Sequence, residues 1–213
     1  MGTRNLTAVY SDGELRVAQY GQWDGYPDGQ GATVLEFCKD ASKLAALKIV
    51  LNRTRFVTDE EREETAKRLG MPEDGWMNQE QAEQWHHAYP YNNRDHGAEI
   101  LNLMVNSAPE SEILLKNDID FVNDSLFCEW AYVIDLDAGQ LECYAGFVTE
   151  PHEGQRFSGD PTQRPTGSYY PVRLLKKYPL DNLPDRAIFC AQLTWLEDHS
   201  GEELPDLVND GQS

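Results

Sequence analysis

The sequence predicts an α+β fold, in which a single sheet is built from an N-terminal β-hairpin and a second hairpin in the C-terminal half, with a central group of helices packed on one side. Apolar residues alternate on both sides of a turn in each hairpin, and between residues 33 and 106 they recur at helical spacing. We assign residues 1–196 to one α+β domain. We expect 197–213, which holds six acids and no lysine or arginine, to be a frayed acidic tail.

The first predicted hairpin turns at Asp12-Gly13, a dipeptide typical of two-residue turns. This turn pairs apolar residues across the hairpin and places them on one face: Tyr10 with Leu15, and Ala8 with Val17. Extended outward, the same register opposes Arg4 to Gly21. We therefore expect Arg4 to lie within direct or water-bridged reach of Asp24 in the loop that follows.

Apolar spacing and capping signals predict the central helices, at residues 33–38, 42–53, 58–70, 78–88 and 93–106. Ser42 is a candidate N-cap, and Thr58 with Glu61 has the spacing of a capping box. Pro90 ends the fourth helix. These segments lie between the two hairpins, so we expect them to pack together against the sheet.

The second predicted hairpin turns at Ala138-Gly139. A two-residue turn there opposes apolar residues: Ile134 to Cys143, and Trp130 to Phe147. This register separates Cys128 from Cys143, so we expect no disulfide between them. After it we expect a loop over 152–167, a short apolar element over 169–178 and a strand over 186–195.

The chain carries 37 acidic and 18 basic residues, a formal charge of −19. This charge repels phosphate backbones and anionic membranes, so direct nucleic-acid binding and membrane binding are not expected. No apolar run is long enough to span a membrane and no leader is visible, which favours a cytoplasmic location. The acidity has three open interpretations: solubility, a high-salt cytoplasm, or a surface that imitates a phosphate backbone.

The four cysteines lack C-x-x-C spacing and are typical of small buried side chains.

The loop over 22–31 is rich in glycine and aromatic residues and leads into a helix. Its glycines are typical either of a tight turn or of a backbone that approaches an anion at a helix N-terminus. The hairpin register brings Arg4 to this loop. It forms either a structural Arg4–Asp24 pair under Trp23, or a pocket with aromatic walls in which Arg4 clamps an anion. The pocket residues in that second interpretation are Arg4, Gln22, Trp23, Asp24 and Tyr26.

The segment 85–97 holds three of the five histidines, but their spacing matches no known metal site, so no metal is predicted. Asp95 is either a charge or cap at the start of a helix, or a member of the same pocket together with Arg94 and His96. No serine or cysteine lies in a nucleophile motif, so covalent catalysis is not predicted.

The opening Thr3-Arg4, the hairpin and then the run Gln22-Trp23-Asp24-Gly25-Tyr26-Pro27 resemble a family of uncharacterised phage, bacterial and fungal proteins that begin Met-x-Thr-Arg and carry a Trp-Asp-Gly-Tyr-Pro motif. The segment Arg94-Asp95-x-Gly97-Ala98 is similar to a segment of its closer members. The resemblance implies a phage or bacterial source, and a site that includes Arg4, Trp23, Asp24, Tyr26, Arg94 and Asp95. It also favours a role against host defence.

Two functions follow from these observations. The first is binding, with turnover left open, of a small anionic, nucleotide-like ligand near the Trp-Asp-Gly-Tyr-Pro loop. Its candidate site residues are Arg4, Gln22, Trp23, Asp24, Tyr26, Arg94, Asp95 and His96. The alternative is an acidic interaction protein or nucleic-acid mimic, whose partner would be a basic host protein and which would inhibit a host defence factor. The ligand site should depend on Arg4 and Trp23, whereas the mimic should depend on surface acids.

Overall fold

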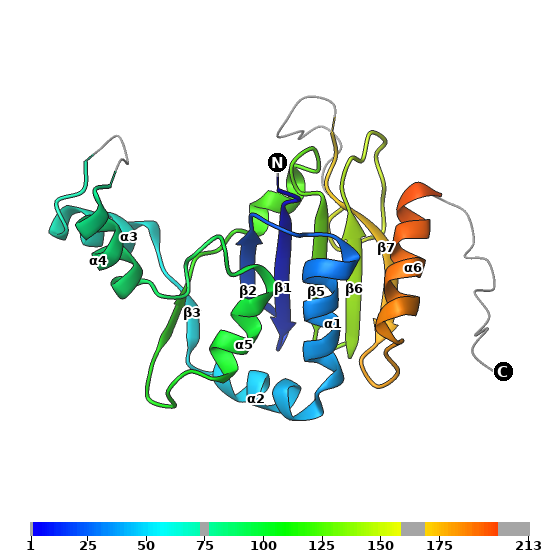
Figure 1. Ribbon diagram of the computed structural model, residues 1–213, viewed down its shortest axis with the longest axis horizontal. Coiled ribbons are helices and arrows are strands. Elements are labelled where there is room, and N and C mark those ends of the chain that lie inside the picture. Colours follow the sequence, from blue (N-terminus) through cyan, green and yellow to red (C-terminus); the bar gives the residue numbers. More distant parts are fainter. Residues whose placement is uncertain (1, 73–76, 159–168, 200–213) are drawn as a thin grey trace.

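The computed structural model describes residues 2–72, 77–158 and 169–199, and it confirms the α+β class (Figure 1). A five-stranded sheet has the strand order β2-β1-β5-β6-β7, and β3 pairs with β4 in a small parallel sheet. The strands are β1 (Asn5–Ser11), β2 (Glu14–Gly21), β3 (Thr54–Phe56), β4 (Ile113–Leu115), β5 (Trp130–Asp135), β6 (Gln140–Ala145) and β7 (Arg173–Pro179). The two predicted hairpins are joined side by side by parallel pairing of β1 with β5.

The first hairpin has the predicted turn, since both Asp12 and Gly13 adopt the positive φ of a type I′ turn. Its register is only partly as predicted. Tyr10 pairs with Leu15, but the register then shifts and Val9 pairs with Val17, which leaves Arg16 as the extra residue of a β-bulge.

The bulge has two consequences for the predicted hairpin. Leu15 and Val17 lie on opposite faces of the sheet, so the expected single apolar face is wrong. Asn5, rather than Arg4, opposes Gly21. The Arg16 guanidinium donates a 2.6 Å hydrogen bond to the Leu51 carbonyl. This tertiary contact stabilises the bulge at Arg16.

The second hairpin is present, but its register differs from the prediction by two residues. Ile134 pairs with Leu141 and Trp130 with Ala145, because a four-residue connection replaces the expected two-residue turn. The Asp135 carboxylate accepts hydrogen bonds from the backbone N–H groups of residues 137 and 138 and shapes this wider connection. A shift of two residues leaves each side chain on its predicted face.

Four helices cover one face of the sheet, as Figure 1 shows for α1, α5 and α6. They are α1 (Ala32–Lys39), α2 (Ala41–Leu51), α5 (Ile100–Val105) and α6 (Arg186–Asp198). Their buried side chains pack with one face of the strands into the main core. The opposite face carries a second core, covered by a 3-10 turn over Ile119–Asn123 and by the segment that includes Phe157.

The expected strand over 186–195 is wrong, because this segment forms α6. Phe189 and Leu193 are one helical turn apart and fully buried, so a helical stripe packs toward the sheet. The helix continues through Asp198, past the predicted domain boundary at 196. The rest of the expected tail, 200–213, lies outside the described residues, as does 159–168 of the expected loop.

Two helices, α3 (Asp59–Arg68) and α4 (Gln79–Ala88), project from the body beside β3 (Figure 1). Thr58 forms the predicted capping box with Glu61, and Asn78 forms a second one with Gln81. Ser42 is not a cap, because the Asp40 carboxylate caps α2 instead. None of the described helices is long and apolar enough to cross a membrane.

The helix expected over 93–106 begins later than predicted. A 3-10 turn spans Gly97–Glu99, and α5 follows from Ile100. Gly97 has φ +49°, a left-handed conformation that interrupts a right-handed helix. Residues 93–96 are therefore free to form a loop beside the end of β2.

Candidate functional site

The loop after β2 is tied to neighbouring backbone at the end of the sheet. Gly25 donates a 2.9 Å hydrogen bond to the Thr3 carbonyl, and Gln22 donates a 3.0 Å bond to the Arg94 carbonyl. The buried Asn5 side-chain amide donates to the Trp23 carbonyl at 3.2 Å. The structure therefore brings the N-terminal segment, the Trp-Asp-Gly-Tyr-Pro loop and the segment around Arg94 together.

The glycine-rich entry to α1 serves packing rather than anion binding. A π-helical turn spans Pro27–Gly31, and a Cβ on Gly31 would meet the Tyr132 hydroxyl at 2.7 Å. The N–H groups of Gly29 and Gly31 donate to the Tyr26 carbonyl, and that of Gln30 donates to the Asp24 carbonyl. These donors are occupied, so the anion-binding interpretation of the glycines is wrong and the tight-turn interpretation holds.

Trp23 is fixed although half of its surface is exposed. Its indole Nε1–H donates a 2.8 Å hydrogen bond to the Asp95 carboxylate, and its ring packs closely on Gly2. Asp95 is therefore neither a helix cap nor a first-turn charge, since α5 begins five residues later and has no side-chain cap. The indole ring is held between the N-terminus and the 94–98 segment.

Gln30 is a site residue that the sequence analysis missed. Its side-chain carbonyl accepts a 2.7 Å hydrogen bond from the Ala98 N–H, and its side-chain amide donates to the Trp23 carbonyl at 3.3 Å. A Cβ on Gly97 would lie 2.5 Å from the Gln30 Oε1. The glycine and the glutamine therefore fit together, and because this contact is tertiary, no local sequence pattern pointed to Gln30.

Arg4 does not form the expected ion pair with Asp24. Its guanidinium instead stacks on the exposed Phe127 ring, 4.4 Å from the centroid, and its backbone N–H donates to the Glu129 carboxylate. Asp24 adopts φ +60° in the loop and packs against Gly29. The displaced register explains the difference, because the residue that opposes Gly21 is Asn5.

Two arginines act on one phenol at this end of the sheet. Burial raises the pKa of Tyr20, the positive charges of Arg4 and Arg94 oppose that shift, and the nearby Asp118 carboxylate adds to it. The Tyr20 hydroxyl donates a 2.7 Å hydrogen bond to the Gln22 side chain. Gln22 is thus in contact with Tyr20, a residue that the sequence analysis did not select, and the charges of Arg4 and Arg94 act on the same hydroxyl.

His96 is half-buried. Burial lowers its pKa, partly offset by the Tyr91 backbone, and its Nδ1 has no hydrogen-bond partner. A neutral imidazole in this position is a packing group rather than an anion-binding cation. Within the described ranges, no group of histidine, cysteine or acidic side chains is arranged to hold a metal ion.

Tyr26 lies in a different environment from the two arginines. It lines a cavity of about 570 Å³ against α6 together with Trp195, His199 and three carboxylate side chains, Asp28, Glu197 and Asp198. An anion is disfavoured beside three carboxylates. Tyr26 therefore lies in a cavity on the α6 side, whereas Trp23 is bonded to Asp95 and Gln22 to the Arg94 backbone outside that cavity.

A buried ionic network on the second core face was also missed. Glu142 on β6 accepts hydrogen bonds from the Tyr144 hydroxyl at 2.6 Å, the Arg156 Nε at 2.7 Å and the Lys177 Nζ at 2.7 Å. Burial raises the pKa of Glu142, but these three donors outweigh it and hold the pKa at about 2. Arg156 also pairs with Asp135. The sequence signal was a single acid among the apolar residues that follow Gln140 in β6.

The chain was compared with protein-family models, with curated protein sequences and with solved structures, and none of them matches it. The fold and the site above therefore carry the functional argument, and the resemblance based on the Trp-Asp-Gly-Tyr-Pro motif stays a prediction.

Proposed function

We propose that this protein binds a small anionic, nucleotide-like ligand on the surface formed by Arg4, Tyr20, Gln22, Trp23 and Arg94. The observation that carries the proposal is that Arg4 lies on the exposed Phe127 ring and Arg94 lies beside the end of β2, while neither arginine forms an ion pair with a described acidic side chain. In a chain with about two acids for each base, two arginines without an acidic partner are favourable positions for an anion from solution.

Trp23 supplies the second element of recognition. Its ring is half exposed and is held by the bond to Asp95, so it does not have to be ordered when a ligand binds. Stacking of a base on such a ring contributes about 1–3 kcal/mol and tolerates different bases. This surface therefore favours a ligand that has both a planar ring and an anionic group. The ring would stack on Trp23, and the phosphate or carboxylate would bind the two arginines.

The experiment uses AMP as the probe, with adenosine and inorganic phosphate as its two halves. Isothermal titration and tryptophan fluorescence should show saturable binding of AMP to the full chain. Each half alone should bind more weakly, because the ring and the anion contact different residues. Arg94→Lys should weaken AMP binding, whereas Arg68→Lys on α3 is the matched control and should leave it unchanged. Equal binding by the wild type and Arg94→Lys would refute the proposed anion clamp.

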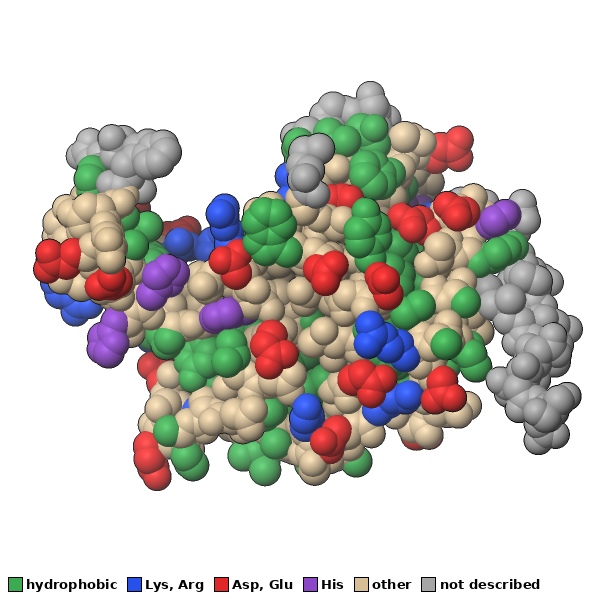
Figure 2. All heavy atoms as spheres, in the orientation of Figure 1, with side chains coloured by type: hydrophobic (Ala, Val, Ile, Leu, Met, Phe, Trp, Pro, Cys, Tyr) green, Lys and Arg blue, Asp and Glu red, His purple; other side chains and the backbone are tan. Residues whose placement is uncertain are grey.

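The net charge of −19 favours a second candidate, a protein that binds a basic host factor through its acidic surface. Figure 2 shows acidic side chains spread over both the body and the projecting arm of the visible face. Neutralising pairs of surface acids would weaken that interaction and leave AMP binding unchanged. The two candidates therefore make opposite predictions for the same variants.

A further inference from the structure

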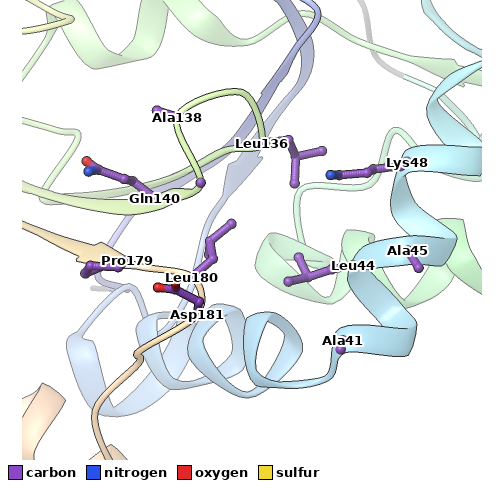
Figure 3. A pocket seen from close by; sticks show the side chains of 11 residues that line it. Ala41, Leu44, Ala45, Lys48, Leu136, Ala138, Gln140, Pro179, Leu180 and Asp181 are labelled. Carbon is purple, nitrogen blue, oxygen red and sulfur yellow. The ribbon is translucent and has the colours of Figure 1, made fainter.

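A cavity of about 650 Å³ lies at the opposite end of the sheet from Trp23, between α2, the β5–β6 connection and the end of β7 (Figure 3). Three leucines from these three segments extend into it: Leu44, Leu136 and Leu180. All three are partly buried and pack against the main core. The volume falls within the range of small-molecule sites, and the walls are mostly apolar.

The α2 side of the cavity combines two small residues, Ala41 and Ala45, with the longer side chains of Leu44 and Lys48. Ala41, Ala45 and Lys48 lie on the side of the helix that faces the cavity, while Leu47 and Leu51 pack in the core on the other side. A helix that is apolar on most of its circumference is normally covered all round. Ala41 and Ala45 are exposed instead, so this side of the helix lacks an apolar partner.

The charged side chains around the cavity determine where the charged group of a ligand would lie. Lys48 reaches across the opening toward Leu136, and it forms no ion pair with a described acid (Figure 3). The acid that it influences is Asp137, whose carboxylate accepts the N–H groups of Asp12 and Gly13. The ammonium group is thus available to a ligand.

Asp181 lies on the other side of Leu180 and is the acid that lines the cavity. Its charge disfavours an anion at that end, so the anionic group of a ligand is directed to Lys48. Gln140 adds a neutral amide to the lining.

We propose that this cavity binds an amphipathic carboxylate, with its hydrocarbon body against the leucines and alanines and its carboxylate on Lys48. This site is independent of the Trp23 surface. The apolar contacts supply most of the affinity, and the ion pair at the exposed rim fixes the orientation.

The test uses decanoate, with decanol and decyltrimethylammonium as probes of the same chain length. Decanoate should bind with one-to-one stoichiometry and shift the backbone amide resonances of residues 41–48 and 136–140. Lys48→Met should weaken decanoate binding up to about fivefold, to the level of decanol, because an exposed ion pair contributes little. Lys67→Met on α3 is the matched control and should change nothing.

Ala45→Trp should fill the cavity and abolish binding of decanoate, and thermal melting would establish that this variant is folded. If it does not fold, the resonance shifts on the wild type still locate the site. The proposal is wrong if decanoate shows no saturable binding or if its resonance shifts map elsewhere. It is also wrong if the folded Ala45→Trp variant binds as well as the wild type. Equal binding of decyltrimethylammonium would refute the role of Lys48.

Discussion

The indole N–H of Trp23 donates a 2.8 Å hydrogen bond to the carboxylate of Asp95, which lies 72 residues further along the chain. This bond joins the loop after β2 to the loop that precedes the 3-10 turn at Gly97. It restricts the orientation of an exposed aromatic ring, which lowers the conformational entropy that stacking on that ring would cost.

Asp95→Ala should release the Trp23 ring while it costs little stability. Removing one exposed hydrogen bond is expected to lower the free energy of unfolding by about 0.5–1.5 kcal/mol. Time-resolved anisotropy of the tryptophan fluorescence, with the other four tryptophans changed to phenylalanine, should show faster ring motion. Asp28→Ala, an exposed acid in the same loop, is the control. Unchanged anisotropy in Asp95→Ala would mean that Gly2 alone holds the ring.

Arg4→Lys and Trp23→Ala should separate binding from stability. Lysine keeps the positive charge but lacks the planar guanidinium of arginine. Arg4→Lys should therefore weaken AMP binding although the charge is unchanged. Trp23→Ala should lower the free energy of unfolding by about 1–2 kcal/mol, because the ring is half-buried, and it should also abolish stacking. Both variants are melted without ligand. If Arg4→Lys alters neither melting nor any ligand interaction, the proposed surface is not a site.

Gly97→Ala should destabilise the fold more than Gly139→Ala. Both glycines have positive φ, which costs an alanine about 1–2 kcal/mol. Only at Gly97 would the new Cβ also meet a side chain, that of Gln30, since nothing lies within 4 Å of the corresponding position at Gly139. Urea unfolding of the two variants measures the difference. Equal destabilisation would show that Gln30 moves aside without cost.

Glu142→Gln should lower the free energy of unfolding by about 3 kcal/mol at pH 7, because it leaves Arg156 and Lys177 with an incomplete set of partners. Since the folded pKa of Glu142 is about 2, below the usual value of about 4.3, its stabilisation is fully present above that usual value. It is lost as the pH falls toward 2. The difference between wild type and variant in urea unfolding should therefore shrink at pH 3. Glu63→Gln, an exposed acid on α3, should have no effect beyond about 0.5 kcal/mol.

The four cysteines are free, which agrees with the expectation for Cys128 and Cys143. Burial raises the pKa of the Cys38 thiol to about 12, whereas Cys190 is only partly buried. Iodoacetamide should therefore label Cys190 first in the native protein and the other three only after unfolding. Mass spectrometry of timed digests measures the order. Early labelling of Cys38 would show that α1 opens readily.

Local signals explain which parts of the fold were predictable. The Asp12-Gly13 turn and the Thr58 capping box are specified by residues a few positions apart, and both are present. The bulge at Arg16 depends on a carbonyl 35 residues away, so alternation within the hairpin could not reveal it. The segment 186–195 was misassigned because its apolar residues fit both periods, and packing against the sheet decides between them.

The contacts of the candidate site were predictable only in part as well. The predicted proximity of Trp23 to the 94–95 segment is present, because hydrogen bonds from Gln22 and Trp23 join the end of the first hairpin to that segment. Their pairings were not predictable, since Asp95 bonds to Trp23 and Arg4 stacks on Phe127 rather than pairing with Asp24. These pairings depend on tertiary contacts, which no local pattern encodes.

The parallel pairing of β1 with β5 also sets an order of assembly during translation. Residues that neighbour each other across these strands, such as Asn5 and Trp130, are about 125 positions apart. The ribosome needs on the order of ten seconds to synthesise the chain between them. Until β5 emerges, β1 is an edge strand with apolar side chains on both faces, the kind of surface that aggregates. The nascent hairpin therefore has to stay unaggregated until β5 is available to pair with it.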